Sequence, residues 1–219
     1  MSTRRGRGVT SNVGSKVCTV SLERQNSENI ELRLPYVILD LNSFVVTHIH
    51  CIKKLEQTLN IFLLDHDIER CAQYHCDQHV VKMILESVQI LCTSLNKMEL
   101  KTPYRSTHNN HPCVLWVGDS YDNFLWLKDL TLFLNDEYLH RFEKQNNHRS
   151  IDVLESISGY RYRRRGLTPF AQAMPGEYKI AGDPVAAYRR FYIAEKLSFA
   201  RWTRRDKPEW IVDEKSEAA

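Results

Sequence analysis

The sequence lacks any apolar run that approaches the roughly 20 residues a helix needs to cross a bilayer. The longest candidate, around residues 36–52, is interrupted by polar or charged side chains at Asp40, Asn42, His48 and His50. We therefore expect no membrane span. With 42% hydrophobic and 26% charged residues in 219 positions, the chain has the composition of a globular protein with a substantial core.

The sequence also lacks the cysteine spacing of a zinc knuckle and the features of a secretory signal peptide. The chain has six cysteines, but no CxxC pair of the kind that holds zinc. The N-terminus lacks the apolar segment and the small-residue cleavage site of a secretory signal peptide. We therefore expect reduced thiols and a location inside the cell, in the cytoplasm or nucleus of a host. No cofactor is expected, and the composition leaves the oligomeric state open.

Acidic residues are absent from the first 16 positions, which carry basic residues together with Gly and Ser: Arg4, Arg5, Arg7 and Lys16. This composition predicts disorder, because it cannot bury enough apolar surface to offset the loss of chain entropy. We assign residues 1–59 to a partly disordered N-terminal extension, in which apolar runs within 31–59 indicate a short strand or two. Residues 60–210 are predicted to form one helical domain that carries catalysis and nucleic-acid binding, and residues 211–219 a flexible tail.

Strand patterns and internal repeats are likewise missing from residues 60–210. The predicted fold class is therefore mainly α, a compact helical domain with long loops. Capping residues and apolar periodicity predict helices over 67–95, 119–142, 150–157 and 184–202. Residues 60–64 form a short apolar run, either a buried strand or the entry of the chain into the core, and 101–118 and 159–182 are predicted loops.

One polar stripe on the first long helix is the strongest chemical signal. Its members recur at steps of three and four and so share one face: His75, His79, Lys82, Glu86, Gln89 and Thr93. An apolar stripe with the same period runs beside it and is expected to face the core: Val81, Ile84, Leu85, Val88, Leu91, Cys92 and Leu95. A solvated helix face with an ordinary Lys82–Glu86 ion pair is the alternative interpretation.

The stripe predicts three catalytic residues, Glu86, Lys82 and His79. Partial burial would raise the pKa of Glu86, so that it acts as an acid or a base near neutral pH. Lys82, one turn away, could use Glu86 as a proton partner and attack an electrophilic carbon to give a Schiff base. We expect Glu86 to be partly buried in a cleft, with His79 or Lys82 within one side-chain length.

Basic residues dominate the C-terminal third of the chain, where residues 160–207 hold twelve Lys or Arg against four acids. Basic side chains that alternate with aromatic ones suit a polyanion whose bases can stack, which predicts DNA or a nucleotide as the partner. The predicted nucleic-acid-binding residues are Tyr160, Tyr162, Arg163, Arg164, Arg165, Arg189, Arg204 and Arg205. A solubilising basic loop is the alternative.

Two further interpretations stay open. The first is a metal-dependent helical enzyme, which requires folding to gather His75, His79, His108 and His111. His75, Asp77, His108 and His111 are further candidates for the functional site, but we assign none of them as a metal ligand. The second is a non-enzymatic, viral nucleic-acid-binding accessory protein, which binds but does not turn over.

The motifs of residues 60–210 resemble an uncharacterised family of small phage and bacterial proteins. The matching segments are 65–67, 74–77, 79–86, 108–112 and 168–175. More distantly, residues 60–142 are similar to the pyrimidine-dimer DNA glycosylases of the phage endonuclease V type. That similarity rests on Asp77-Gln78-His79, Glu86, the turn Asn110-His111-Pro112, and the end of the second long helix at 137–141.

The resemblance to the glycosylases implies a small all-α fold, base excision in DNA repair, and a catalytic role for Glu86. It also implies that the amine of the processed chain start is the nucleophile. Two departures stand out: the arginine expected just before the glutamate is Leu85 here, and 59 residues precede Asn60. A start or processing site near Asn60, a substitution by Lys82, or different chemistry would each account for the second departure.

Overall fold

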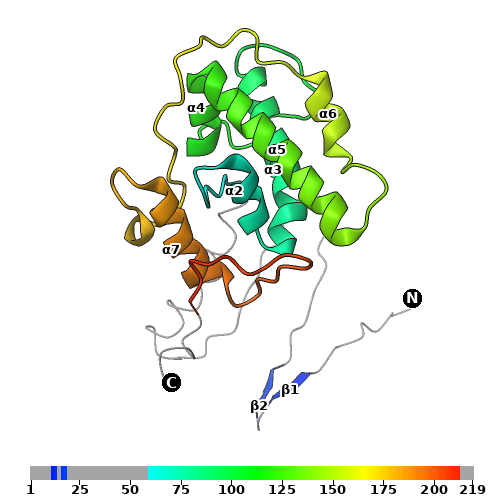
Figure 1. Cartoon of the computed structure of the whole chain (residues 1–219), viewed down its shortest axis with the longest axis vertical. Helices are drawn as coiled ribbons and strands as arrows, with labels where there is room; N and C mark the ends of the chain where they lie inside the picture. The colour runs from blue at the N-terminus through cyan, green and yellow to red at the C-terminus, as the bar shows by residue number, and fades with distance from the viewer. Residues whose placement is uncertain (1–10, 14–15, 19–58, 213–219) are drawn as a thin grey trace, which may run out of the picture. The chain divides into compact units, whose positions relative to one another are not determined.

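The computed structural model describes residues 11–13, 16–18 and 59–212 (Figure 1). The chain divides into two units, Met1–Ile49 and His50–Ala219. In the first unit, β1 (Ser11–Val13) and β2 (Lys16–Cys18) pair as antiparallel strands. The partial disorder expected of residues 1–59 stays a prediction, as does the domain boundary at Asn60. The strand or two expected within 31–59 lies outside the described residues, apart from Leu59.

Helices make up the described part of the second unit, which confirms the mainly α fold class. They are α2 (Ile68–Tyr74), α3 (Asp77–Asn96), α4 (Pro112–Asp119), α5 (Tyr121–Phe142), α6 (Ser150–Ser156), the 3₁₀ helix η1 (Gly176–Tyr178) and α7 (Pro184–Lys196). The two longest, α3 and α5, pack on each other (Figure 1), and α4 contacts both. Leu127, Leu130 and Leu134 of α5 are buried in the same core cluster as the apolar residues of α3.

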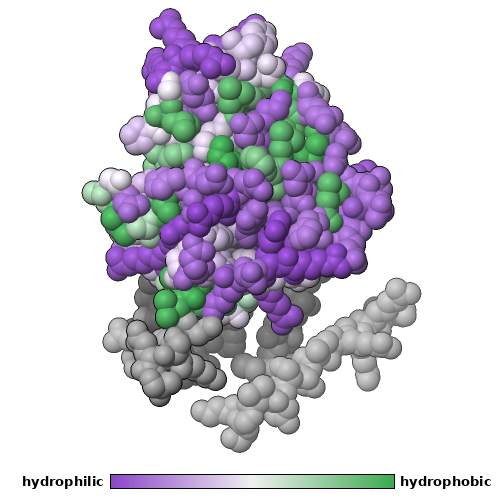
Figure 2. Space-filling model, in the orientation of Figure 1, coloured by the Kyte–Doolittle hydropathy of each residue, from purple (hydrophilic) through white to green (hydrophobic). Residues whose placement is uncertain are grey.

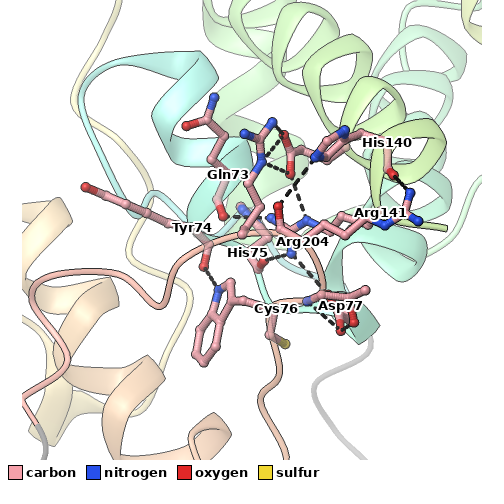
Figure 3. A network of polar contacts seen from close by, with 12 residues as sticks. Gln73, Tyr74, His75, Cys76, Asp77, His140, Arg141 and Arg204 are labelled. Carbon is pink, nitrogen blue, oxygen red and sulfur yellow. Dashed lines mark hydrogen bonds and ion pairs between the residues drawn. The ribbon is translucent and has the colours of Figure 1, made fainter. Parts of the chain in front are cut away.

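The helix predicted over 67–95 is two helices, because the chain is extended at His75 and Cys76, with ψ angles of 136° and 161°. Arg141 on α5 satisfies carbonyls that the break exposes: its Nη1 donates to His75 and its Nη2 to Gln73, each at 2.7 Å (Figure 3). Trp202 Nε1 donates to the Tyr74 carbonyl at 3.0 Å. These partners lie more than 60 residues away, so the local pattern carries no sign of the break.

Two further boundaries differ from prediction. Residues 112–119, predicted as loop, form α4, which Pro112 begins and His111 caps, because the His111 Nδ1 accepts a hydrogen bond from the Cys113 N–H at 3.3 Å. Helix α7 ends at Lys196 rather than near residue 202. The chain leaves the helix there and the Arg201 carbonyl accepts the Asp77 N–H, the first of α3, at 2.8 Å.

The buried sector of α3 is wider than the predicted stripe and rotated from it. Val81 and Leu85, expected in the core, are 37% and 39% exposed. The buried positions include much of the predicted polar stripe as well as the core side chains: His79, Val80, Met83, Ile84, Glu86, Ser87, Val88, Ile90, Leu91, Cys92, Thr93, Ser94 and Leu95. Aromatic residues from outside α3, among them Phe62 and Tyr192, cover His79 and so draw part of the polar stripe into the interior.

The surface of the helical unit is mainly hydrophilic on the face that Figure 2 shows, with apolar residues in small separate groups. Among the described residues, no helix combines the length and the apolar character that a bilayer crossing requires.

Candidate functional site

Glu86 lies in the middle of α3 and is only 5% exposed. One carboxylate oxygen, Oε1, lies 3.0 Å from the Nζ of Lys82, one turn earlier. The other, Oε2, accepts a hydrogen bond from the backbone N–H of Asn60 at 3.2 Å. Burial raises the pKa of Glu86, and the contacts with Lys82 and Asn60 only partly oppose that rise. The predicted burial of Glu86 and its contact with Lys82 are confirmed.

Lys82 gives this buried carboxylate a partner on the surface. Its side chain is 53% exposed, against 6% for that of Glu86. The amine is therefore open to a large ligand, while the carboxylate behind it is shielded from water. This arrangement can pass a proton between a reacting group at the surface and a base in the interior.

Asn60 is held in place by segments from far along the chain. Its Nδ2 donates to the Ala173 carbonyl at 3.0 Å, and its Oδ1 accepts the N–H of Ile61 at 2.8 Å. The Tyr188 hydroxyl lies 3.0 Å from the same Oδ1, and the Cys113 Sγ lies 3.9 Å from it. The backbone nitrogen of Asn60 is thus fixed beside Glu86 by contacts with α4, α7 and the loop before η1.

That loop, residues 168–175, is itself anchored. Thr168 exchanges two hydrogen bonds with the Asn123 amide, at 3.0 Å and 2.7 Å. The Gln172 amide binds both backbone groups of Ile180, at 2.6 Å and 2.9 Å. The motifs of 79–86 and 168–175 therefore meet at Asn60, which donates to Glu86 and to Ala173, and the motif of 108–112 leads directly into Cys113, which lies beside Asn60.

His79 is buried, 6% exposed, and its ring stacks on Phe62 with centroids 4.6 Å apart. Its Nδ1 lies 2.8 Å from the Tyr192 hydroxyl. Burial lowers the pKa of His79 to about 2, with smaller contributions from His75, Lys196 and Lys82. The imidazole is therefore neutral at physiological pH, and this geometry lends no support to His79 as a proton donor.

The four histidines do not assemble into a metal site. Within the part of the chain that the structure describes, no group of three or more His, Cys, Asp or Glu could hold a metal ion. His75 is fully buried, and its Nδ1 donates to the Cys71 carbonyl at 2.7 Å. His108 forms the turn at a φ of 52°, and His111 caps α4.

A second cluster of charges, which we call the Arg141 network, lies between α5 and the C-terminal segment (Figure 3). The fully buried Arg141 donates through Nε to Glu137 at 2.7 Å, and Arg205 Nη2 lies 2.6 Å from the other Glu137 oxygen. Burial alone would raise the pKa of Glu137, but the hydrogen bonds from Arg205 and Arg141 outweigh it, and the pKa lies below its usual value. Asp77 accepts from the Thr203 N–H and hydroxyl and pairs with Arg141 at 3.3 Å. Asp77 and Arg205 thus make structural contacts here.

Two other predicted nucleic-acid-binding arginines are already paired. Arg189 binds Asp65 at 2.8 Å and lies over the rings of Tyr74 and Trp210, at 5.7 Å and 5.4 Å from their centroids. Arg204 pairs with Glu143. A phosphate would have to compete with these internal partners.

The basic loop is more open, though only in part. Tyr160 is 68% exposed, with the guanidinium of Arg161 5.9 Å from its ring centroid, and Arg163 is also exposed. Tyr162, by contrast, is 9% exposed and its hydroxyl lies 2.7 Å from the Ser94 Oγ, so its ring is not presented for stacking. Arg164 and Arg165 lie 3.6 Å and 3.5 Å from acidic partners, Asp122 and Asp119.

The sequence did not single out Tyr188 and Tyr192 as parts of the site. They lie four residues apart on α7, fully buried, and their hydroxyls reach Asn60 and His79 respectively. Two tyrosines at this spacing on a helix share one face, and a buried tyrosine hydroxyl needs a polar partner. The spacing of Tyr188 and Tyr192 in the predicted helix could therefore have indicated that both hydroxyls bind polar groups in the interior.

Residues 59–150 match the family model of pyrimidine dimer DNA glycosylase. The resemblance to that family is therefore confirmed over a stretch that includes Asn60, Lys82 and Glu86 and ends at the start of α6. The match supports a DNA-repair, glycosylase-like function at the level of the family. No curated protein and no solved structure matches the chain.

Proposed function

We propose that the protein excises a base from DNA in a glycosylase or glycosylase/lyase reaction, with Glu86 as the proton-transfer group. The observation that carries the proposal is a buried carboxylate between two nitrogen atoms, the Lys82 Nζ at 3.0 Å and the Asn60 backbone N at 3.2 Å. The family match supplies the substrate class, DNA, and with it a working location inside the cell.

The chemistry follows from an amine next to a base. The amine lone pair forms a bond to the sugar C1′ while the bond from C1′ to the nucleobase breaks, and its electron pair leaves with the base. Glu86 takes a proton from the nitrogen, and the sugar ring then opens as its oxygen accepts a proton, which leaves a C=N bond to the protein. The raised pKa of Glu86 suits this role, because the carboxyl group must both accept and return a proton.

Two nitrogen atoms compete for the role of nucleophile. In the whole chain the Asn60 nitrogen is an amide bonded to Leu59, so Lys82 supplies the amine. In a chain that begins at Asn60, the same nitrogen would be an amine beside Glu86. The family match begins at Leu59, one residue before Asn60, which favours the second arrangement.

Borohydride trapping separates the two amines. The whole chain and a chain released by a protease so that it begins at Asn60 are incubated with UV-irradiated duplex DNA, without metal. Borohydride reduces the C=N bond and leaves a covalent adduct. An adduct that Lys82→Ala abolishes identifies Lys82, and one formed only by the shorter chain identifies the Asn60 amine.

Glu86→Gln is the matched control, since it keeps the shape of the side chain and removes the proton-transfer group. We expect it to bind DNA and to lose turnover. Binding without an adduct in either chain would favour a non-enzymatic accessory protein. Turnover that survives Glu86→Gln but needs a metal and His111 would favour the metal-dependent enzyme.

The exposed residues of the basic loop are the part of the predicted DNA surface that best fits this site. Tyr162 fixes the loop to Ser94, eight residues after Glu86 on α3, a rise of about 12 Å. DNA binding should weaken with salt, and replacing Arg163, Arg164 and Arg165 together by Ala should flatten the slope of log K against log salt by up to about three units. About three units is the upper limit, reached if each arginine contacts one phosphate. Because Arg164 and Arg165 already have acidic partners, we expect the slope to flatten by about one unit, the contribution of Arg163. An unchanged slope would place the DNA elsewhere.

A further inference from the structure

The solvent-facing side of α3 around Lys82 has an unusual composition. We call it the α3 outer face and define it as Gln78, Val81, Lys82, Leu85 and Gln89. These positions follow each other at steps of one, three and four, so they form one strip along the helix. Val81 and Leu85 are two of the few large aliphatic side chains that the described residues leave exposed, at 37% and 39%.

The strip carries no exposed acid. Between Gln78 and Gln89 the one acidic residue is Glu86, which is buried and paired with Lys82. The outer face of a helix in a globular protein is normally rich in charges of both signs. Here a single cation is set among amides and aliphatic side chains, a surface that does not repel phosphate.

An exposed aromatic side chain lies on the other side of Lys82. Phe199, in the turn after α7, is 36% exposed and edge-on to His79, with ring centroids 5.8 Å apart. His79 precedes Lys82 by three residues and Leu85 follows it by three, so Phe199, which packs on His79, and Leu85 flank the Lys82 position from opposite directions along the helix. Lys196 adds a second cation: its backbone carbonyl accepts the Phe199 N–H at 3.2 Å, and its Nζ lies 4.9 Å from the Phe191 ring centroid. The positive charges of Lys196 and Lys82 repel each other.

Helical spacing thus puts the exposed Leu85 one turn after Lys82, and the exposed Phe199 packs on His79, one turn before it. Stacked bases shield C1′ in duplex DNA, so an enzyme that acts there must first disturb the stack. Apolar side chains such as Leu are inserted between base steps for that purpose, and aromatic side chains hold unstacked bases. The positive charge of Lys82 and Lys196 complements the phosphates on either side.

We propose that DNA docks on the α3 outer face, with Leu85 as a wedge that enters the base stack and Phe199 as the platform for a displaced base. The proposal rests on the proposed function in taking DNA as the substrate, and adds how the strand is opened at Lys82. It gives Leu85 the function of a wedge, at the position where the glycosylase resemblance leads one to expect an arginine.

Base unstacking can be measured apart from chemistry. The whole chain is titrated with a duplex that contains one pyrimidine dimer and a 2-aminopurine next to it, whose fluorescence rises when it leaves the stack. We expect the wild type to raise the fluorescence and Leu85→Ala to bind with little loss of affinity but without most of the rise. Phe199→Ala should weaken binding about tenfold, the scale of one lost base–aromatic contact.

Leu132→Ala is the matched control, because Leu132 is 38% exposed on α5 and the proposal gives it no role. It should match the wild type in affinity and in fluorescence. If Leu85→Ala does not fold, which a thermal melt reports, Leu85→Gln tests the same side chain with its length kept. A fluorescence rise in these Leu85 variants equal to that of Leu132→Ala would overturn the wedge.

The outcomes also separate this inference from the proposed function. A rise in 2-aminopurine fluorescence with the wild type, without a borohydride adduct, would support the docking face and contradict the excision reaction. An adduct that forms equally well in Leu85→Ala and Phe199→Ala would support excision and overturn the docking face. A wild type that does not bind the duplex would overturn both.

Discussion

The helices α3 and α5 each carry an acidic and a basic side chain four residues apart, and the two ion pairs differ in their exposure to solvent. On α3, Lys82 is half exposed and Glu86 is buried. On α5, Glu137 and Arg141 are both buried, with side chains 5% and 0% exposed. The same spacing yields one ion pair that opens to the surface and one that is closed within the protein.

The difference lies in the number of partners. Glu137 receives hydrogen bonds from two guanidinium groups, those of Arg141 and Arg205, and its pKa is lowered although burial acts against this. Glu86 has one ammonium and one backbone N–H, and burial raises its pKa. A carboxylate with every lone pair engaged is a structural element, whereas one held by a half-exposed ammonium and one backbone N–H can still exchange a proton.

The chemistry of the cations adds to this contrast. The planar fork of Arg141 binds Glu137, two backbone carbonyls and Asp77 at once, and a lysine cannot reproduce that geometry. Lys82 makes one contact and keeps its amine near solvent. The spacing of the pair therefore predicts that the two charges meet, and the kind of cation decides what the contact is for.

The largest expected effect comes from breaking the closed pair. Arg141→Met leaves the carbonyls of Gln73 and His75 without their donor and Glu137 with one partner fewer, so we expect a loss of about 3–5 kcal/mol in the free energy of unfolding. Urea denaturation measures it. Lys82→Met removes the cation of the open pair and should cost less, about 1 kcal/mol, because Glu86 keeps the Asn60 N–H and, with its pKa already raised by burial, can take up a proton. Equal losses in the two variants would erase the distinction.

Removing the two carboxylates should separate stability from activity. Glu86→Gln should lower the rate of base excision by about 10²–10⁴-fold, the usual contribution of a general acid or base, with little effect on unfolding. Glu137→Gln should destabilise the fold by roughly 3 kcal/mol, because it removes the carboxylate that Arg141 and Arg205 share and leaves the buried Arg141 with only the longer ion pair to Asp77, at 3.3 Å. Single-turnover kinetics on folded protein and urea titrations give the two readouts. A stable but inactive Glu137→Gln would reverse the assignment.

The pH dependence of stability should have opposite signs for the two carboxylates. The pKa of folded Glu86 is raised above 4.5, so above pH 4.5 the unfolded chain loses this proton first, and wild-type stability falls as pH rises toward the folded pKa. The pKa of folded Glu137 is lowered, so its contribution is present above pH 4.5 and is lost as pH falls through the folded pKa.

Each Gln variant isolates its own contribution when its unfolding free energy is subtracted from that of the wild type at every pH. The Glu86 difference should become less favourable to the wild type above pH 4.5, and the Glu137 difference should shrink below it. Parallel profiles would mean that the two sites hold their protons alike.

The smallest expected effect concerns His79, whose imidazole should not take up a proton across the physiological pH range. Burial lowers the pKa of His79 to about 2, so its imidazole NMR resonances should stay unchanged from pH 8 to about pH 4, a range in which a solvated histidine passes through its transition. A transition of His79 near pH 6.5 would show that water reaches the ring, and would restore His79 as a candidate for proton transfer.

Local sequence determined several features correctly. Capping residues were part of the signal that predicted the helices, and Asp67, Ser120 and Asp183 cap α2, α5 and α7 through hydrogen bonds from N–H groups two or three residues on. The Lys82–Glu86 contact also follows from position alone, since residues four apart on a helix lie within about 6 Å of each other. In each case the partners are separated by a single turn.

Tertiary structure decided the rest. The break at His75 and Cys76 depends on Arg141 and Trp202, and the position of Asn60 beside Glu86 depends on Tyr188, 128 residues away. Likewise, the exposure of Leu85 and the neutrality of His79 depend on which segments cover each side of α3. Helical period determines which side chains are neighbours within an element, but it carries no information about the distant segments that bury one face and leave another open. At this site, those distant segments decide how far Glu86 is buried and Lys82 exposed, whereas the contact between the two follows from the helix itself.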